Sequence, residues 1–111
     1  MQIPSHRLKA VKEQLKMKTF VIVDNEIIDK KSYQAYIEAI APTVEEFEGT
    51  YLIRGGTLLF SDSEWNPDRL VVIEFPDNNS ALDWVQSPEL AKLHQKRRRY
   101  AKSKMIVVEG L

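Results

Sequence analysis

The chain has 111 residues, sixteen basic and sixteen acidic side chains, and no cysteine. This length is typical of one domain that buries its own core, and the lack of cysteine excludes disulfides, thiol catalysis and zinc–thiolate sites. The balanced charge argues against a protein dedicated to nucleic acid or to membrane surfaces, and no apolar run approaches the roughly 20 residues of a spanning helix. We expect a soluble protein in a reducing, cytoplasmic setting.

Residues 1–16 form a charged segment ahead of the first strand-like run. Leu8, Val11 and Leu15 fall at i, i+3 and i+7, which is the spacing of a narrow apolar stripe on a helix. The segment lacks the apolar centre of a signal peptide. We therefore predict an amphipathic helical extension over residues 1–16 and one domain over residues 17–111.

Four later runs are rich in β-branched and aromatic residues, as strands are. They are Lys18–Ile28, Tyr51–Phe60, Arg69–Phe75 and Ser103–Glu109. A polar turn around Asn66-Pro67-Asp68 separates the second run from the third. These runs predict four β-strands.

Helical segments separate the first two strands and the last two. Asp29 is placed to cap a helix that begins near Lys30, and Pro42 is expected to break or restart it. A short second helix is predicted over Thr43–Phe47. Two further helical segments are expected to begin at Asn79 or Ser80 and at Ser87.

The resulting order is βαββαβ. With right-handed crossovers this order predicts a ferredoxin-like α+β fold, a four-stranded antiparallel sheet with both helices on one face. The strand Arg69–Phe75 carries apolar side chains on both of its faces. Because helices cover only one face, we predict a homodimer joined through the open sheet face.

The strand pair between Tyr51 and Phe75 contains two arginines that core support alone does not require. Arg54 precedes two glycines, where the backbone can approach a ligand closely, and its planar guanidinium suits a carboxylate or phosphate. Arg69 has the same capacity. Its alternative role is to anchor the turn by pairing with Asp68 or Glu64.

Glu74 lies inside an otherwise apolar strand, where a lone buried carboxylate would be costly. One hypothesis makes Glu74 a general base or a carboxylate that orients a substrate. The other, which we favour, is a structural ion pair with Arg54 or Arg69, since structural pairs also resemble functional sites.

Four other residues complete the predicted site. Tyr36 is the tyrosine best placed to enter a pocket, and with Glu74 it is a candidate catalytic residue. Trp65 is a lid or, preferably, a packing cap on a partner subunit. His94 suits a haem ligand in type, but its charged neighbours predict a solvated face, and Arg97 lies one turn further on. No cluster has metal-ligand spacing, so we expect neither metal nor cofactor.

The basic run Lys96–Lys102 invites comparison with nucleic-acid-binding domains. The order βαββαβ also occurs in RNA-binding modules, which place aromatic side chains on the exposed sheet. The third strand here lacks their aromatic–glycine signature. Basic residues at a helix C-terminus, which suit the helix dipole, explain the run more simply.

In their order and spacing, several motifs resemble the domain of unknown function 1330 family, within the dimeric α/β-barrel superfamily. They are FVIVDNEI, the helix with Tyr33 and Tyr36, YLIRGG, W-x-P-x-R at Trp65, VVIEFP, W-x-x-SPE at Trp84, the Arg97/Arg99 pair and VVEGL. The resemblance covers Lys18 to Leu111. It implies a dimer whose two sheets face each other and assigns no activity.

The wider superfamily includes cofactor-free monooxygenases, muconolactone isomerase-like enzymes and haem-dependent proteins. This chain departs from the family pattern at Leu90, where tyrosine is common, in the strongly basic run Lys96–Lys104, and in the segment before Met17. The departure at Leu90 removes any role for a hydroxyl at that position.

Two functional hypotheses remain open. The first is a homodimeric protein that binds a small anionic or aromatic molecule, with or without cofactor-free catalysis. Its site would lie between sheet and helices and consist of Tyr36, Arg54, Trp65, Arg69, Glu74, His94 and Arg97. The second is a non-catalytic interaction module whose polar residues only stabilise the dimer. RNA binding comes third.

Overall fold

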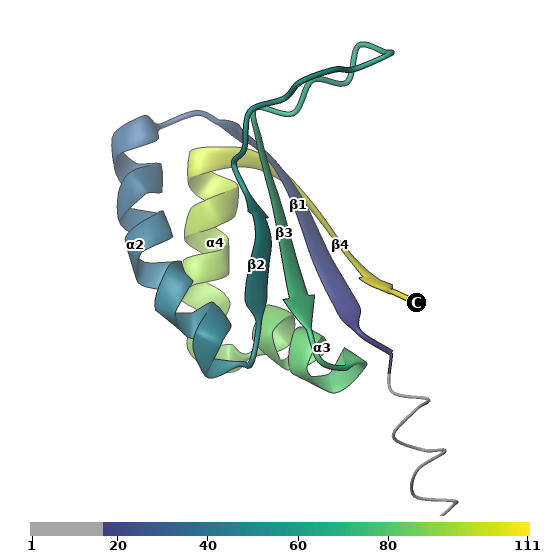
Figure 1. Ribbon diagram of the computed structural model, residues 1–111. Coiled ribbons are helices and arrows are strands. Elements are labelled where there is room, and N and C mark those ends of the chain that lie inside the picture. The colour runs from purple at the N-terminus through teal and green to yellow at the C-terminus, as the bar shows by residue number, and fades with distance from the viewer. Residues whose placement is uncertain (1–16) are drawn as a thin grey trace, which may run out of the picture.

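The computed structural model describes residues 17–111, so the predicted helical extension over residues 1–16 lies outside the described residues. Figure 1 shows the elements in chain order. They are β1 (Thr19–Ile27), α2 (Lys30–Glu46), β2 (Thr50–Arg54), β3 (Arg69–Phe75), α3 (Asn78–Gln86), the 3₁₀ helix η1 (Pro88–Leu90), α4 (Ala91–Tyr100) and β4 (Ala101–Glu109). No helix in this part of the chain is long and apolar enough to cross a membrane.

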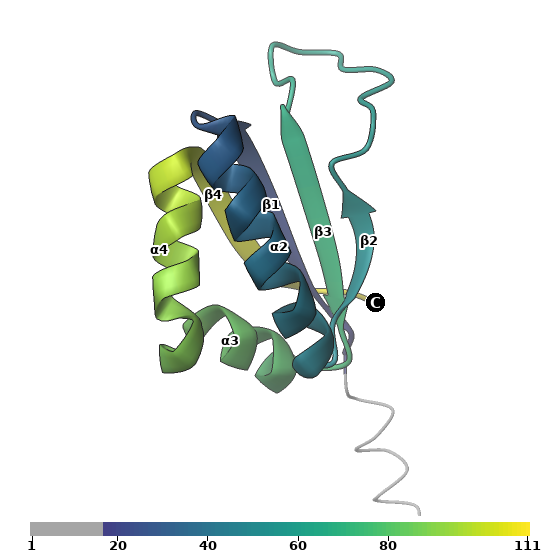
Figure 2. The ribbon, with the colours of Figure 1, turned by 90° about the vertical axis from the view of Figure 1, so that its left-hand side faces the viewer.

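The sheet has the strand order β2-β3-β1-β4, and every neighbouring pair is antiparallel. The helices pack against one face of the sheet, with α2 and α4 side by side along the strands and α3 near one end (Figure 2). This arrangement confirms the predicted ferredoxin-like α+β fold.

The core lies between this face and the helices. Alternate residues of β1 and β3 point into it, among them Val21, Ile73 and Phe75, which are all but inaccessible to solvent. Trp84 of α3 closes one end of the core, since its ring lies 5.8 Å from that of Phe75 and its Nε1 donates to Thr43 Oγ1 at 3.0 Å. The buried indole therefore has a partner for its one polar group.

The prediction that β2 runs to Phe60 is wrong. The strand ends at Arg54, because Gly55 turns the chain with a φ of 68° and its N–H bonds to the Leu70 carbonyl. Residues 56–68 then form a loop that projects beyond the sheet (Figure 1). The exposed Leu59 and Phe60 give this loop the composition of a strand, but no neighbouring strand pairs with it.

The predicted break at Pro42 is also wrong, because α2 continues through this proline to Glu46. A proline inside a helix removes one N–H donor and crowds the carbonyl four residues before it, but here the turn that follows it is held by buried side chains. Thr43 and Val44 are buried, and Thr43 Oγ1 donates to the Ile40 carbonyl at 2.6 Å. The predicted helix Thr43–Phe47 is thus the last turn of α2.

Helices α2 and α3 each begin directly after an aspartate that caps them. Asp29 caps α2 as predicted and accepts from the Ser32 N–H at 3.1 Å. Asp77 caps α3 by accepting from the Ser80 N–H at 2.8 Å, so this helix begins slightly earlier than expected.

The other face of the sheet carries no helix. One row of apolar side chains crosses it, because Ile22 on the central strand β1 pairs with Val72 on β3 and Ile106 on β4. Ile106 is 58 % exposed. An uncovered apolar sheet face of this kind marks an interaction surface.

Gly49 provides a test of the packing between α2 and the sheet. A Cβ at this position would lie 2.8 Å from both Phe75 Cε1 and Val44 Cγ1. We expect Gly49→Ala to lower the free energy of unfolding, measured in urea, by about 1–3 kcal/mol because the core would be overpacked. Gly56→Ala is the control, since nothing lies within 4 Å of its added Cβ. Equal losses in the two variants would contradict this packing.

Candidate functional site

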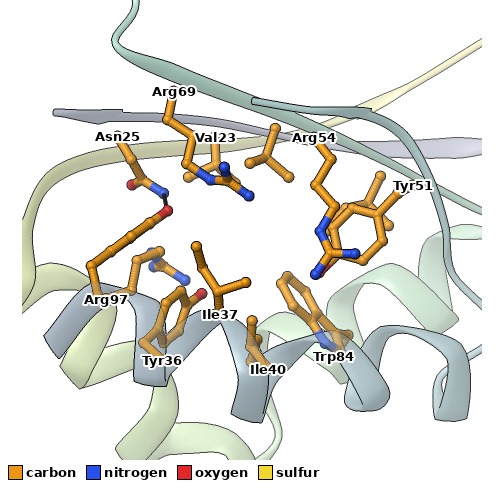
Figure 3. A pocket seen from close by; sticks show the side chains of 13 residues that line it. Val23, Asn25, Tyr36, Ile37, Ile40, Tyr51, Arg54, Arg69, Trp84 and Arg97 are labelled. Carbon is orange, nitrogen blue, oxygen red and sulfur yellow. Dashed lines mark hydrogen bonds between the residues drawn. The ribbon is translucent and has the colours of Figure 1, made fainter. Parts of the chain in front are cut away.

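A small cavity lies between the sheet and the helices (Figure 3). Six elements contribute its wall, which consists of Val23, Asn25, Tyr33, Tyr36, Ile37, Ile40, Tyr51, Arg54, Arg69, Val71, Ile73, Trp84 and Arg97. Its volume is about 30 Å³. That space holds a water molecule or the head group of a small ligand.

Three arginines reach the cavity at different depths. Arg97 of α4 is the most buried at 4 % exposed, Arg69 of β3 is half-buried, and Arg54 of β2 is exposed. The Arg54 guanidinium lies 4.6 Å from the centre of the Tyr51 ring, and that of Arg69 lies 5.9 Å from the Tyr33 ring. Within residues 17–111, none of the three forms an ion pair with a carboxylate.

Gly55 explains how Arg69 reaches its position. A Cβ on Gly55 would collide with the Arg69 guanidinium, and the positive φ of this residue suits glycine. The residue that directly follows β2 therefore both turns the chain and leaves space for the arginine. The motif Arg54-Gly55 thus serves the site as well as the turn.

Arg97 is a buried cation whose partners are neutral. Its Nε donates to Ser103 Oγ at 3.0 Å, and its Nη1 lies 2.6 Å from His94 Nδ1. A guanidinium stays charged in proteins, and burying an ion costs several kcal/mol before a counter-ion offsets the cost. The interior around Arg97 therefore carries an uncompensated positive charge.

His94 is buried, so the prediction of a solvated face is wrong. Its ring packs edge-on against Trp84, with the ring centres 4.8 Å apart, and the side chain is 3 % exposed. The charged neighbours in sequence point away from this face of α4. The prediction failed because the neighbours of a residue along the sequence do not show which side of a short helix faces the core.

The contacts of His94 define its tautomer. Nε2 lies 3.0 Å from the Trp84 carbonyl oxygen, which can only accept, so Nε2 carries the proton and Nδ1 accepts from Arg97. Burial lowers the pKa of His94 below its usual 6.5; the Trp84 carbonyl opposes this shift and the charges of Arg97 and Arg98 reinforce it. Both ring nitrogens are therefore engaged, which leaves neither free to bind a haem iron.

The tyrosines add hydroxyl donors to the cavity. Burial raises the pKa of Tyr36 to about 12, and the charge of Arg97 offsets only part of this effect. The Tyr36 hydroxyl therefore keeps its proton at neutral pH. Tyr33 Oη accepts from Asn25 Nδ2 at 2.6 Å, which leaves its own proton available. Together with the arginines, these groups make a cavity rich in donors.

Glu74 is not part of this cavity, and its predicted pairing with Arg54 or Arg69 is wrong. Strand side chains alternate between faces, and in β3 Val71 and Ile73 point toward the helices. Glu74 therefore points to the open face, where it lies 3.1 Å from Lys18 Nζ. Glu74 and the arginines with which we expected it to pair therefore lie on opposite sides of the sheet.

Trp65 also lies away from the cavity. It is exposed in the loop of residues 56–68, and its Nε1 donates to Asp24 Oδ2 at 2.7 Å. Of the predicted site residues, the cavity wall therefore includes Tyr36, Arg54, Arg69 and Arg97. His94 does not line the cavity, but it accepts a hydrogen bond from Arg97, which does.

Asn25, Tyr33 and Tyr51 are wall residues that we did not predict. Asn25 follows Val21 and Val23 at the core-facing positions of β1, where an amide is unexpected. That polar break in an alternating apolar pattern is the signal that marks it. Tyr33 and Tyr51 have no such signal, since buried tyrosines are usual in cores.

The metal-ligand set is equally informative. Among the described residues, no group of three or more histidine, aspartate or glutamate side chains lies close enough to hold a metal ion. The polar groups of the cavity wall belong to arginine, tyrosine, asparagine and tryptophan side chains.

The strand order and the helices on one face of the sheet define a ferredoxin-like α+β domain. Residues 18–111 match the family described as a domain of unknown function (DUF1330), and the chain belongs to that family. No curated protein matches the chain.

Solved structures share this fold at low identity. One is the RPA0582 protein of unknown function from Rhodopseudomonas palustris, with a TM-score of 0.65 and 16 % identity over 98 % of this chain and 95 % of that one. Another is SnoaB, a cofactor-independent oxygenase from Streptomyces nogalater, with a TM-score of 0.59 and 14 % identity over 86 % of this chain and 94 % of that one.

The lowered pKa of His94 predicts how stability depends on pH. As the pH falls below about 6.5, histidine in the unfolded chain takes up a proton that the folded His94 resists, so the free energy of unfolding decreases. We expect this decrease between pH 7.5 and 5.5 to be smaller in His94→Gln, measured by urea denaturation. An identical pH dependence in the two proteins would contradict the buried neutral tautomer.

Proposed function

We propose that this protein is a homodimer that binds a small anionic molecule in the cavity between its sheet and helices. The observation that carries the proposal is Arg97, a buried cation with only neutral partners. Arg69 and Arg54 line the same cavity nearer its rim. A bound carboxylate or phosphate would offset this charge and accept several charge-assisted hydrogen bonds.

The alternative is a non-catalytic module whose polar residues only stabilise the dimer. That hypothesis requires the arginines to pair with carboxylates of the protein or to lie on the open face. Arg97 and Tyr36 instead lie inside the subunit on the helix side of the sheet, and no carboxylate in residues 17–111 pairs with the arginines. These positions favour ligand binding.

The proposed dimer joins two open sheet faces. The apolar row formed by Val72, Ile22 and Ile106 lies uncovered there, and a second copy of the same face would bury it with matched chemistry and two-fold symmetry. The cavity lies on the other side of the sheet. Each subunit would therefore keep its own binding site.

A cofactor-free enzyme is a second candidate function, favoured by the shared fold with a cofactor-independent oxygenase. Tyr36 lines the cavity, and its raised pKa suits a hydrogen-bond donor to a bound substrate better than a general base. Glu74, the other residue we considered for catalysis, lies on the opposite face. Catalysis would therefore depend on Tyr36 and the arginines.

We further propose that residues 17–111 form the binding domain. We place the protein in the cytoplasm. The lack of cysteine supports a reducing compartment.

Arg69→Met tests the anion site. The probe ligands are acetate and inorganic phosphate, and the readout is the thermal midpoint. A ligand at about 100 times its Kd stabilises the folded state by about 2.7 kcal/mol. We expect one of the two anions to stabilise the wild type, and Arg69→Met to lose that response because its guanidinium lines the cavity.

Two variants complete this experiment. Arg98→Met is the matched control, because Arg98 lies exposed on α4 next to Arg97 and outside the cavity. Arg54→Met should change stability by less than about 1 kcal/mol, since Glu74 pairs with Lys18 and is not left alone. Loss of the anion response in Arg98→Met, or its retention in Arg69→Met, would count against the cavity as the site.

Ile106→Lys tests the dimer. The side chain is 58 % exposed in one subunit, so lysine leaves the fold intact while placing a charge in the proposed interface. We expect sedimentation equilibrium to give a dimer mass for the wild type and a monomer mass for Ile106→Lys. Leu82→Lys, on the exposed side of α3, should remain dimeric. A monomeric wild type at micromolar concentration would rule out the dimer.

A further inference from the structure

Two buried polar atoms in the cavity wall lack hydrogen-bond partners. They are Asn25 Oδ1, an acceptor, and Arg69 Nε, a donor, and among the described residues no other buried side-chain nitrogen or oxygen is left without a partner. Both belong to residues that line the cavity. Their backbones are register partners on β1 and β3, so the two side chains start from adjacent positions on the same face of the sheet.

The nitrogen of the Asn25 amide already has a hydrogen-bond partner. Asn25 is 2 % exposed, and its Nδ2 donates to Tyr33 Oη at 2.6 Å. This contact turns Oδ1 into the group that needs a donor. An unsatisfied buried acceptor is costly, and in native structures each such group calls for an explanation, of which a bound molecule is one.

A plain carboxylate cannot satisfy both atoms. An ionised carboxylate only accepts hydrogen bonds, so it pairs with Arg69 Nε but leaves Asn25 Oδ1 unpaired. The missing group must carry an O–H or N–H. An ammonium group has such protons, but its positive charge would lie beside Arg69 and Arg97 and be repelled. A neutral hydroxyl on an anionic molecule satisfies both requirements.

We propose that the ligand is a small hydroxycarboxylate, an inference that rests on the proposed anion-binding function. Its carboxylate accepts hydrogen bonds from Arg69 Nε and the neighbouring guanidinium groups. Its hydroxyl donates to Asn25 Oδ1. Because Asn25 and Arg69 are adjacent in register, the hydroxyl lies close to the carboxylate along the ligand, as in 2-hydroxy and 3-hydroxy acids.

The cavity also limits the size of the ligand. A volume of about 30 Å³ suits the polar head of the molecule, and typical pockets for drug-sized ligands are at least about ten times larger. Figure 3 shows Arg69 and Asn25 together on one side and Arg54 with Tyr51 on the other. A larger ligand would therefore extend past Arg54, the exposed residue at the rim.

The test compares ligands that differ by one hydroxyl. Glycolate is paired with acetate, and lactate with propionate, and the Kd of each for the full chain is measured by titration calorimetry. We expect each hydroxy acid to bind at least about tenfold more tightly than its partner, because the analogue leaves a buried acceptor unpaired. Equal affinity within both pairs would overturn the proposed ligand class and indicate that a water molecule or the opposite amide orientation serves Asn25.

Asn25→Leu adds a second readout, since it removes the acceptor and keeps most of the volume. We expect this variant to bind acetate and glycolate with similar affinity. Asn66→Leu is the control, because Asn66 lies in the exposed loop outside the cavity and should leave the glycolate preference unchanged. A preference that persists in Asn25→Leu would place the hydroxyl elsewhere and overturn the assignment.

The two proposals fail in different ways. Binding of acetate and propionate without a hydroxyl preference leaves the anion-binding function standing and removes only the ligand class. If none of the four acids binds to the wild type, both the ligand class and the proposed carboxylate site are wrong. The wild-type titrations decide this outcome even if Asn25→Leu fails to fold.

Discussion

The alternation of side chains across the antiparallel sheet is the constraint on which the rest of this structure depends. Each strand residue points to one of two faces. On β3 this rule sends Arg69, Val71 and Ile73 toward the helices and Glu74 toward the open face. The helix face therefore receives the arginine without the carboxylate. The cavity has its positive charge because the nearest acidic residue of the same strand belongs to the other side.

The open face follows from the same rule. The alternate residues of β1, β3 and β4 bring Ile22, Val72 and Ile106 into one row, and no helix covers that row. The two faces thus have separate roles in our proposal, since one binds a second subunit and the other holds the ligand. A substitution on one face is expected to leave the other face largely intact, because no side chain belongs to both faces.

Buried polar groups distinguish this cavity from an ordinary gap in a core. Arg97 is held by neutral partners, His94 is fixed as one tautomer between Arg97 and the Trp84 carbonyl, and Asn25 contacts Tyr33. Such a network orders its members when its hydrogen bonds are complete. The atoms that remain unpaired, on Asn25 and Arg69, then define which hydrogen-bonding groups the proposed ligand must have.

The sequence by itself determined the element order and the fold class, because hydrophobic period and capping residues such as Asp29 act over a few neighbouring positions, and its motifs resemble those of the family. It also identified Tyr36, Arg54, Arg69 and Arg97 as residues of the site, the arginines because a charged side chain is unusual within or beside an apolar strand or helix face. The errors arose where a local pattern met a tertiary constraint. Leu59 and Phe60 have strand composition but no strand to pair with, and Pro42 stays helical because the turn after it is buried.

Only the tertiary structure decided which polar residues meet. Glu74 and Arg69 both lie on β3, yet they face opposite sides of the sheet, whereas Asn25 and Arg97 are far apart in the chain and line one cavity. His94 is buried because Trp84 from the preceding helix packs against it. These pairings depend on register and on packing between distant segments, and neither quantity is encoded in the neighbours of a residue along the chain.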